Sequence, residues 1–314
     1  MNIFMKTNQA NCAAVVVSFY PDHEILSHIS LLCSLCHTVV IVDNTPAETV
    51  VSYPSHQNLI LHRNRFNKGL AYALNKGIEL AHDAGFEHIF LLDQDTRVPL
   101  DYFNKMLDFK YRVEAVSDRC AFCVPNFYDR NSQSFANFPI IRPFSFRHTT
   151  CVSFDYGMKS GVLIAITSGM LISYSMFKEI GNFPEDYFID FIDNEYSLRA
   201  GDMGLKVAVN CNVSLDHAIG NRRTHRLWKL TIKPNHHSHI RRYYIARNGI
   251  IAAAKYMKDY PAYVLLIGLR LVHESLSILI FEKFKSKKLI AMIIGCWHAF
   301  LKRTGKYEAI NGKI

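Results

Sequence analysis

The segment HIFLLDQD (88–95) decides the fold, because an uninterrupted apolar run ends there in two acids. Such a run is typical of a parallel strand that is covered on both faces. Three upstream segments have the same character: AAVVVSFYP (13–21), TVVIVDN (38–44) and NLILHR (58–63). Helical patterns separate several of these strands, so the sequence predicts an α/β fold with a mostly parallel sheet flanked by helices.

The intervening and later segments support this alternation. HEILSHISLLCSLC (23–36) and NKGLAYALNKGIELAHDAG (67–85) carry apolar residues at helical spacing. Strand patterns return at 161–174, with a break at Ser168-Gly169, and at 205–218, and a helix is predicted to begin near Asn194. Ligands of such sheets bind beyond the carboxyl ends of the strands, so the functional residues are expected at that edge.

Composition narrows the class of protein. The 314 residues are 49% hydrophobic and 20% charged, which excludes wholesale disorder, and the net charge of +9 indicates an anionic partner. A nucleic-acid-binding protein is disfavoured, because the basic residues are scattered and form no recognition motif. The first twenty residues show no signal-peptide pattern, so we expect a cytoplasmic location.

The eight cysteines are expected to be reduced thiols in such a location. Two CxxC pairs, Cys33/Cys36 and Cys120/Cys123, leave a zinc site open as an alternative. The second pair lies in a predicted strand, where residues three apart point to opposite faces. That geometry disfavours zinc.

Asp93 and Asp95 form the clearest candidate site. Two carboxylates two residues apart in a loop after a strand can both approach one divalent cation, Mg²⁺ or Mn²⁺, whose remaining ligands are diphosphate oxygens. The cation would neutralise the charge that develops on a departing nucleoside diphosphate. The alternative is a solvated turn.

Asp43 ends the second strand, where an acid can accept hydrogen bonds from a nucleotide. The alternative is an Asx-turn. The loop after the first strand lacks GxGxxG, which disfavours a nicotinamide or flavin enzyme.

Asp193 is the candidate general base. It lies with Asp190 and Glu195 in YFIDFIDNEYSLRAG, just before the predicted helix. As an N-cap it would be structural, and as a base it would remove a proton from an acceptor hydroxyl. The neighbouring Phe191 and Ile192 favour a raised pKa for its carboxyl group, because burial disfavours the charged form.

The chain is expected to divide into a catalytic domain (1–260) and a C-terminal amphipathic helical region (261–314). The segments 263–281 and 287–303 are apolar with basic flanks, but Arg270, His273 and Glu274 lie in the middle of the first. We therefore expect helices that lie at a membrane surface rather than cross it. The alternative is a helical cap buried against the catalytic domain.

Taken together, six segments resemble glycosyltransferase family 2 in order and spacing: AAVVVSFYP, VDN, HRNRFNKGLAYALNKGI, FLLDQDT, ITSGMLIS and YFIDFIDNEYSLRA. They are most similar to its bacterial rhamnosyltransferase branch, over roughly residues 12 to 250. Tyr196 stands where the branch usually has Trp, and Ile192 stands where many relatives have Glu, which leaves Asp193 to carry the base role.

The resemblance implies a GT-A fold and an inverting transfer of L-rhamnose from dTDP-β-L-rhamnose. The acceptor would be an undecaprenyl-diphosphate-linked saccharide, at the inner face of the membrane, in O-antigen or related lipopolysaccharide synthesis. It further implies donor contacts by Ser18, Tyr20, Asp43, Arg65 and Asp93, metal contacts by Asp95 and His217, and acceptor or supporting roles for Ser168, Gly169, Asp190, Glu195 and Arg247.

The segment 219–242 is basic and rich in histidine, and Arg247 lies just beyond it. Arg241, Arg242 and Arg247 could bind phosphate or form a solvated helix face, and the histidines at 225, 236, 237 and 239 are read as a loop over the active site. A family 2 enzyme that uses a UDP-sugar remains the alternative function. A catalytically inactive scaffold is disfavoured by the presence of all four acids: Asp43, Asp93, Asp95 and Asp193.

Overall fold

The computed structural model describes residues 10–129, 133–151, 161–217, 225–227, 230–232 and 236–307. Within them, one mixed sheet has the strand order β11-β5-β10-β4-β1-β2-β3, and β6 pairs with β5. The strands are β1 (Ala10–Ser18), β2 (Cys36–Asp43), β3 (Leu59–Arg63), β4 (His88–Asp93), β5 (Cys120–Asp129), β6 (Ser134–Phe135), β10 (Met170–Ser173) and β11 (Lys206–His217).

Parallel pairing aligns the strand ends at one edge. β1 lies parallel to β2 and β4, β2 parallel to β3, and β5 parallel to β11, whereas β10 is antiparallel to β4 and β5. The register pairs Ser18 with Asp43, Val17 with Asp93, and Asp43 with Arg63. The mostly parallel sheet is therefore confirmed, and it brings these residues to the edge where ligands of such sheets bind.

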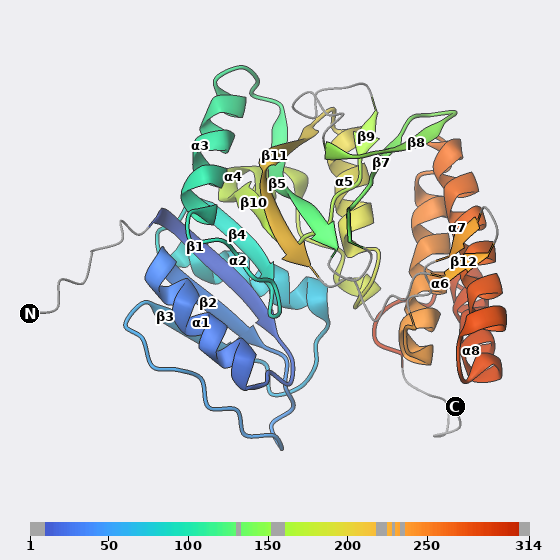
Figure 1. Ribbon diagram of the computed structural model, residues 1–314, viewed down its shortest axis with the longest axis horizontal. Helices are drawn as coiled ribbons and strands as arrows, with labels where there is room; N and C mark the ends of the chain where they lie inside the picture. Colours follow the sequence, from blue (N-terminus) through green and yellow to red (C-terminus); the bar gives the residue numbers. More distant parts are fainter. Residues whose placement is uncertain are drawn as a thin grey trace, which may run out of the picture.

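Helices flank the sheet, and the last three, from residue 239 onward, form the helical part of the molecule. Figure 1 shows that α5 lies between the sheet and α6, and that α6, α7 and α8 stand together beside it. The expected C-terminal helical extension is thus confirmed. The helices are α1 (His23–Leu35), α2 (Leu70–Asp83), α3 (Tyr102–Glu114), α4 (Tyr174–Ile180), α5 (Ile192–Asp202), α6 (His239–Lys255), α7 (Pro261–Phe281) and α8 (Lys285–Phe300).

Among the described residues, two small sheets of short strands accompany the main sheet. β7 (Phe138–Ile141) pairs with β8 (Phe146–Thr149) and with β9 (Val162–Leu163), and α7 contacts β8. β12 (His225–Leu227) and β13 (Leu230–Ile232) pair antiparallel. The domain boundary after residue 260 stays a prediction, and α6, on its catalytic side, packs against both α7 and α8.

The apolar core is continuous from the sheet into α7. Val15, Val40 and Leu91 are fully buried in the sheet, and Tyr263 and Ile267 of α7 belong to the same cluster. At Gly295 of α8, a Cβ atom would lie 2.4 Å from the carbonyl oxygen of Tyr243, so only glycine allows α8 this close to α6.

A buried set of charges also joins the three helices of the helical part. Arg242 of α6 forms ion pairs with Glu274 of α7 and with Glu282, and Lys288 of α8 donates to Glu282 at 2.6 Å. Arg242 and Glu282 are almost inaccessible to solvent. The interpretation of Arg242 as a phosphate ligand or part of a solvated face is therefore wrong, because its charge is matched inside the protein.

Two expectations about cysteines are wrong. Cys151 and Cys211 form a disulfide, with Cα atoms 5.4 Å apart, while the other six are free. Their sequence separation of 60 hides this proximity. In β5, a register shift opposite Lys206 and Val207 brings the sulfur atoms of Cys120 and Cys123 to 3.8 Å, although a regular strand would point them apart.

Candidate active site

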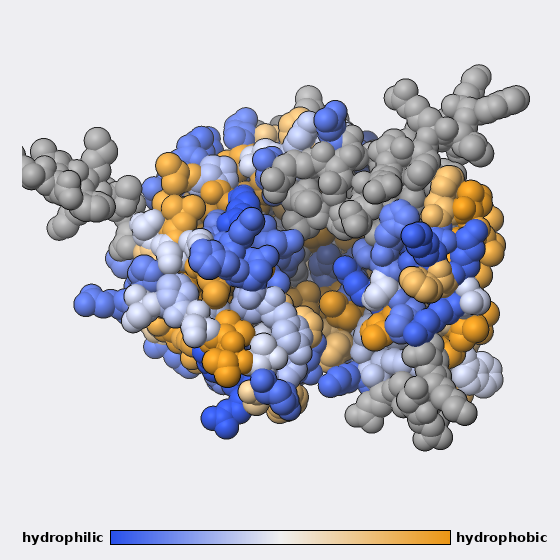
Figure 2. Space-filling model, turned by 60° about the horizontal axis from the view of Figure 1, so that its bottom comes forward, coloured by the Kyte–Doolittle hydropathy of each residue, from blue (hydrophilic) through white to orange (hydrophobic). Residues whose placement is uncertain are grey.

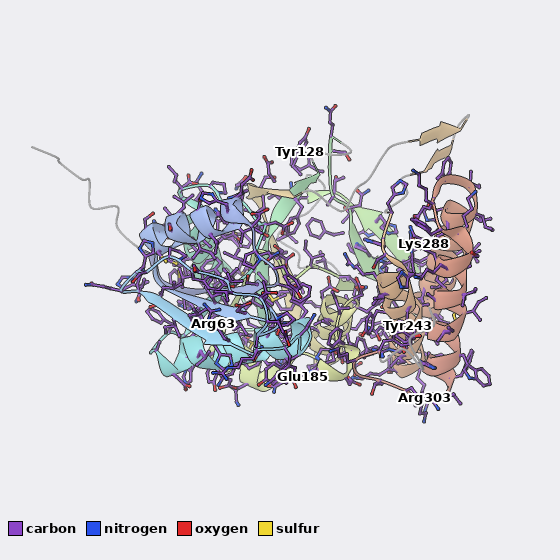
Figure 3. All side chains as sticks on the ribbon, turned by 90° about the horizontal axis from the view of Figure 1, so that it is seen from below. Arg63, Tyr128, Glu185, Tyr243, Lys288 and Arg303 are labelled. Atoms are coloured by element: carbon purple, nitrogen blue, oxygen red, sulfur yellow. A yellow bond between two sulfur atoms is a disulfide. The ribbon has the colours of Figure 1, made fainter. Side chains whose placement is uncertain are left out.

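A cleft of about 1140 Å³ opens between the sheet edge and the helical part. Figure 2 shows this hollow, with apolar and charged side chains on its walls, and Figure 3 shows Arg63 in the sheet part and Tyr243 and Lys288 in the helical part on either side. Of the residues given a role from the sequence, the cleft is lined by Asp93, Asp95, Ser168, Asp190, Asp193, His237 and Arg241.

The Asp93-Gln94-Asp95 loop is held by Gln94. Its carboxamide accepts a hydrogen bond from the backbone N–H of Phe19 at 2.8 Å and donates to the carbonyl of Phe19 at 3.2 Å. This pairing fixes the loop after β4 against the loop after β1. Asp93 and Asp95 then line the cleft on either side of the anchored residue.

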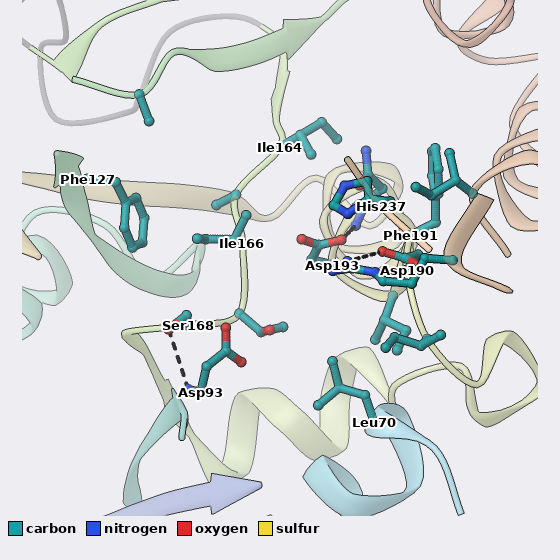
Figure 4. Close-up of a pocket in the computed structure, with 18 of the residues that line it drawn as sticks. Leu70, Asp93, Phe127, Ile164, Ile166, Ser168, Asp190, Phe191, Asp193 and His237 are labelled. Carbon is teal, nitrogen blue, oxygen red and sulfur yellow. Dashed lines mark hydrogen bonds and ion pairs between the residues drawn. The ribbon is translucent and has the colours of Figure 1, made fainter. Parts of the chain in front are cut away.

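Ser168 and Gly169 form the turn before β10, and Ser168 supports the same loop. The Ser168 hydroxyl lies 2.5 Å from the hydroxyl of Thr96 and accepts from the Asp93 N–H at 3.4 Å, and Figure 4 marks the second contact. Gly169 does not line the cleft, and its carbonyl accepts from the Tyr102 hydroxyl. Ser168 thus faces the cleft, whereas Gly169 packs behind it.

Of the five predicted donor contacts only Asp93 lines the cleft, and the other four lie outside its lining. Asp43 is buried, and one carboxylate oxygen accepts from the N–H of Thr45 at 2.8 Å while the other lies 3.6 Å from Arg63. The Asx-turn considered for Asp43 is therefore present. Ser18 is buried and donates to Gln94 at 3.3 Å. Tyr20 and Arg65 are exposed.

A loop with unusual backbone geometry carries the other acids. Phe188, Asp190 and Phe191 all have positive φ, of 65°, 63° and 65°, which is unfavourable for side chains with a Cβ atom. Buried hydrogen bonds from α6 hold it: the Asn248 amide donates to the carbonyls of Tyr187, Ile189 and Asp190 at 2.9, 2.8 and 3.0 Å. These contacts offset the backbone strain.

The same loop is also held from the opposite side, by residues at the start of α2. The N–H of Leu70, at the start of α2, donates to the carbonyl of Phe188 at 2.7 Å. Gly69 has φ of 92°, and a Cβ atom there would lie 2.7 Å from this carbonyl oxygen. Asn44, which lines the cleft, donates to the carbonyl of Gly69 at 3.0 Å. The loop is therefore clamped between α2 and α6.

Asp193 is the second residue of α5, whose N-cap is Phe191, so the prediction that Asp193 is the N-cap is wrong. Its Oδ1 accepts from the N–H of Asn194 at 2.9 Å. Burial raises the pKa of Asp193 to about 6, against the opposing effects of this hydrogen bond and of the Arg270 cation. A carboxyl group with this pKa is ionised at neutral pH and still accepts a proton readily.

Figure 4 shows Asp93 and Ser168 on one side of the cleft and Asp190, Asp193 and His237 across from them. Asp190 accepts from Arg241 at 2.6 and 3.3 Å. Arg241 also lines the cleft, so it is the one member of the arginine trio that faces the site.

Glu195 and Arg247 do not line the cleft. Glu195 is buried and bonded to Arg199, to Lys255 at 2.6 Å and to the Tyr256 hydroxyl at 3.1 Å; burial raises its pKa, but hydrogen bonds to Arg199 and Lys255 outweigh this and lower it. Arg247 is buried and donates to the carbonyls of Asp186, Tyr187 and Gly305. Both join α6 to the segment around α5. The side chains of His217 and His225 lie outside the described residues.

Three residues of the cleft or its supports were given no functional role from the sequence. Arg270 and His273 were seen only as polar residues inside an apolar segment, yet both line the cleft from α7. Their spacing of three residues, which puts them on one helix face, is the signal that could have shown it. Asn248, with Arg247, resembles the rhamnosyltransferase branch, but its role could not be predicted because its partners lie 58 to 61 residues away.

Comparisons with known proteins identify the family to which the chain is similar. The family model described as glycosyl transferase family 2 matches residues 25–181. A dTDP-rhamnosyl transferase, RfbF, of Shigella flexneri is 29% identical over 255 residues, covering 78% of this chain and 81% of the relative.

Solved structures of S. aureus TarS 1-349 align over 96% of this chain and 95% of that one. The TM-scores are 0.48 for one crystal structure, at 9% identity, and 0.49 for its complex with UDP-GlcNAc, at 10% identity. The family match spans half the chain and includes the β4 acids. The chain therefore belongs to glycosyl transferase family 2, and its mixed sheet with flanking helices is the family's GT-A fold.

Proposed function

We propose that this enzyme transfers L-rhamnose from dTDP-β-L-rhamnose, with inversion, to a lipid-linked saccharide in the synthesis of O-antigen or another cell-surface polysaccharide. The observation that carries a transfer reaction is the placement of two acidic groups across one cleft, Asp93 and Asp95 at the strand ends and Asp193 opposite. The rhamnosyl donor is supported by the similarity to the Shigella flexneri relative.

The loop after β4 is proposed to hold the leaving group. Asp93 and Asp95 offer carboxylate oxygens on the cleft wall, and Mg²⁺ in proteins is commonly held by one or two carboxylates together with substrate phosphates. These carboxylate oxygens therefore fit Mg²⁺ or Mn²⁺, which when bound would stabilise the charge on the departing diphosphate. Asp95 is the proposed protein ligand, and His217 stays a prediction. Among the described residues, no group of three metal-binding side chains occurs.

The residues behind this loop are proposed to shape the part of the site that binds the nucleotide. Ser18 acts through Gln94, and Asp43 acts through the turn at Thr45, whose hydroxyl accepts from the N–H of Tyr20 at 2.9 Å. The exposed side chains of Tyr20 and Arg65 remain proposed direct contacts with the nucleotide.

Asp193 is proposed as the general base. As the acceptor oxygen forms its bond to the anomeric carbon, its proton passes to the Asp193 carboxylate. The bond between that carbon and the diphosphate oxygen breaks, and its electron pair leaves on dTDP. Asp190 and Ser168 support the acceptor side, while Glu195 and Arg247 act by holding α5 and its preceding loop.

The outer face of the helical part is proposed to rest on the inner face of the cell membrane. α7 is the one helix among the described residues that is long and apolar enough to cross a bilayer, with a mean hydropathy of 1.9. It carries Arg270 and His273 on the cleft and Glu274 in the buried charge network, which favours lying at the surface over spanning.

An apolar surface with a basic border supports that location. Figure 2 shows apolar side chains at the outer edge of the helical part, and Lys283, Lys285, Lys302 and Arg303 are exposed next to them. The exposed apolar residues of α7 and α8 are Leu265, Leu269, Val272, Leu276, Leu279, Ile280, Ile290, Ile293, Trp297 and Phe300.

A donor panel tests the proposed function. The protein is incubated with Mg²⁺ and dTDP-rhamnose, UDP-galactose or UDP-N-acetylglucosamine, and thermal shift and donor hydrolysis are measured. We expect stabilisation and turnover with dTDP-rhamnose, both lost on chelation of the metal. A response to a UDP-sugar alone would overturn the donor assignment.

A further inference from the structure

Arg270 is a cationic side chain of the cleft that forms no close ion pair with the described residues. Arg270 lines the cleft from α7, and its guanidinium carbon lies 4.9 Å from the centre of the Phe191 ring. Among the described residues it makes no recorded ion pair or hydrogen bond. The neighbouring Arg241, by contrast, is paired with Asp190. Arg270 therefore has its hydrogen-bond donors available to a ligand.

Arg270 lies on the acceptor side of the cleft. Phe191, which it covers, is the N-cap of α5 and precedes Asp193 by two residues. The Arg270 cation also acts on the Asp193 carboxyl group, opposing the rise in its pKa. Asp93 and Asp95, proposed to hold the donor diphosphate, lie on the other wall. A ligand at Arg270 is thus placed beside the base rather than beside the leaving group.

His273 extends the polar wall toward the outside. It is exposed, it lines the cleft, and it follows Arg270 by three residues, so the two side chains are neighbours on the surface of α7. The only acid of α7 in this lining, Glu274, is paired with Arg242 in the buried network. The α7 wall therefore presents a net positive charge to the cleft.

The apolar face of α7 begins directly beside His273. Leu269 precedes it by four residues and Leu276 follows it by three, so both adjoin it on the helix surface. Leu269 and Leu276 are each 52% exposed, and Val272 is 59% exposed. A cationic wall and an apolar face thus meet along one helix, and this arrangement fits a ligand that has an anionic head and a hydrocarbon tail.

We propose that Arg270 and His273 form a binding site for the phosphate groups of a lipid-tailed acceptor, whose hydrocarbon chain runs along Leu269, Val272 and Leu276. The inference rests on the proposed function, because it takes the acceptor to be lipid-linked. Arg270 binds phosphate oxygens through two parallel N–H donors, and His273 adds a third. The saccharide beyond the phosphate then lies toward Asp193.

The test uses farnesyl diphosphate as a short lipid-tailed probe and inorganic diphosphate as its tail-free counterpart. Binding is measured by calorimetry for the full chain and for Arg270→Gln, His273→Gln and Leu276→Gln. Arg112→Gln, an exposed arginine on α3, is the matched control. We expect farnesyl diphosphate to bind about tenfold more weakly to Arg270→Gln, severalfold more weakly to His273→Gln and Leu276→Gln, and unchanged to Arg112→Gln.

Three outcomes would overturn the site. If Arg270→Gln binds farnesyl diphosphate as tightly as the parent protein does, Arg270 does not bind the diphosphate group. If the parent protein binds inorganic diphosphate as tightly as farnesyl diphosphate, the hydrocarbon chain does not contact the apolar face of α7. Displacement of farnesyl diphosphate by dTDP, with no need for Arg270, places the probe in the donor site. Should Arg270→Gln fail to melt cooperatively, Arg270→Lys, which keeps the charge but loses the paired donors, gives the same comparison.

The donor assignment is tested separately from this site. In a transfer assay, Arg270→Gln is expected to raise the KM for the lipid-linked acceptor about tenfold and to leave the KM for dTDP-rhamnose unchanged. If dTDP-rhamnose fails to bind while farnesyl diphosphate still binds through Arg270, the proposed donor is wrong and the site stands. If dTDP-rhamnose is used normally and Arg270→Gln changes neither KM, the site is wrong and the donor stands.

Discussion

The two acidic walls of the cleft are built in different ways. Asp93 and Asp95 follow a buried strand whose register with β1 is regular, and one side chain, Gln94, anchors their loop. Asp190 lies in a loop with three positive φ angles, and Asp193 follows it; amides from α6 and α2 hold this loop. Both walls depend on contacts between distant segments, but the first is anchored by one side chain at a regular strand edge, whereas the second needs several buried hydrogen bonds from two helices to hold a strained loop.

This difference has a consequence for mutation. Changes near the first wall are expected to act on donor binding and to leave the fold almost intact. Changes in the supports of the second wall are expected to lower both activity and stability, because unpaired carbonyl groups would remain buried. The predictions below test this contrast, from the largest expected effect to the smallest.

Asp193→Asn is expected to lower kcat for transfer by about a thousandfold, because an amide cannot accept the acceptor's proton. Donor binding, measured by calorimetry with dTDP-rhamnose, should stay within about twofold of the parent, since Asp193 lies across the cleft from the donor acids. Asp190→Asn is the comparison variant and should lose less. Transfer that survives in Asp193→Asn would show that another group is the base.

Asn248→Ala is expected to lower the free energy of unfolding by about 3 kcal/mol, since it leaves the loop carbonyls of Ile189 and Asp190 without this donor. Its kcat should fall as well, because the loop before Asp193 is released. Urea unfolding and steady-state kinetics measure both effects. The exposed Asn182→Ala is the control and should change stability by less than about 0.5 kcal/mol. Loss of stability without loss of kcat would mean that the loop does not position Asp193.

The pH dependence should show the state of Asp193. Its carboxyl group has a raised pKa of about 6, so it is protonated below that pH and cannot act as a base. The value of kcat/KM should therefore rise with pH up to about 6 and then level off, falling about tenfold per unit on the acid side. Arg270→Gln removes a cation that favours the ionised form, so its acid limb should move to higher pH. A limb near pH 4 would contradict this interpretation.

Gln94→Ala is expected to have the smallest effect on the fold, a loss of about 1 kcal/mol in the free energy of unfolding. It removes the two hydrogen bonds to Phe19 and frees the loop that carries Asp93 and Asp95. The KM for the donor should rise severalfold while the thermal midpoint changes little. A larger loss of stability than in Asn248→Ala would reverse the proposed contrast between the two walls.

The sequence predicts the first wall far better than the second. The apolar runs of β1, β2 and β4 are long enough to identify, and parallel pairing then requires their acidic ends to meet. For Asp43 the sequence left two roles open, and the structure shows the Asx-turn. The C-terminal helices were also predictable from their apolar length.

The second wall was only partly predictable, because its supports come from helices whose packing no apolar strand pattern or pairing register indicates. Asp193 could be identified, but its position inside α5 depends on the left-handed Phe191, which sequence patterns do not indicate. For Arg247 the sequence left ligand binding, a supporting role and a solvated face open, and the structure shows it buried and bonded to backbone carbonyls about 60 residues away. The Cys151–Cys211 disulfide is hidden for the same reason.

The buried charges of the helical part limit how this enzyme can change over evolution. Arg242, Glu274, Glu282 and Lys288 form a set of two cations and two anions whose charges cancel. Replacing one member leaves an unmatched charge in the interior, so substitutions are tolerated only in compensating pairs. We expect relatives to keep all four residues or to have lost a cation together with an anion.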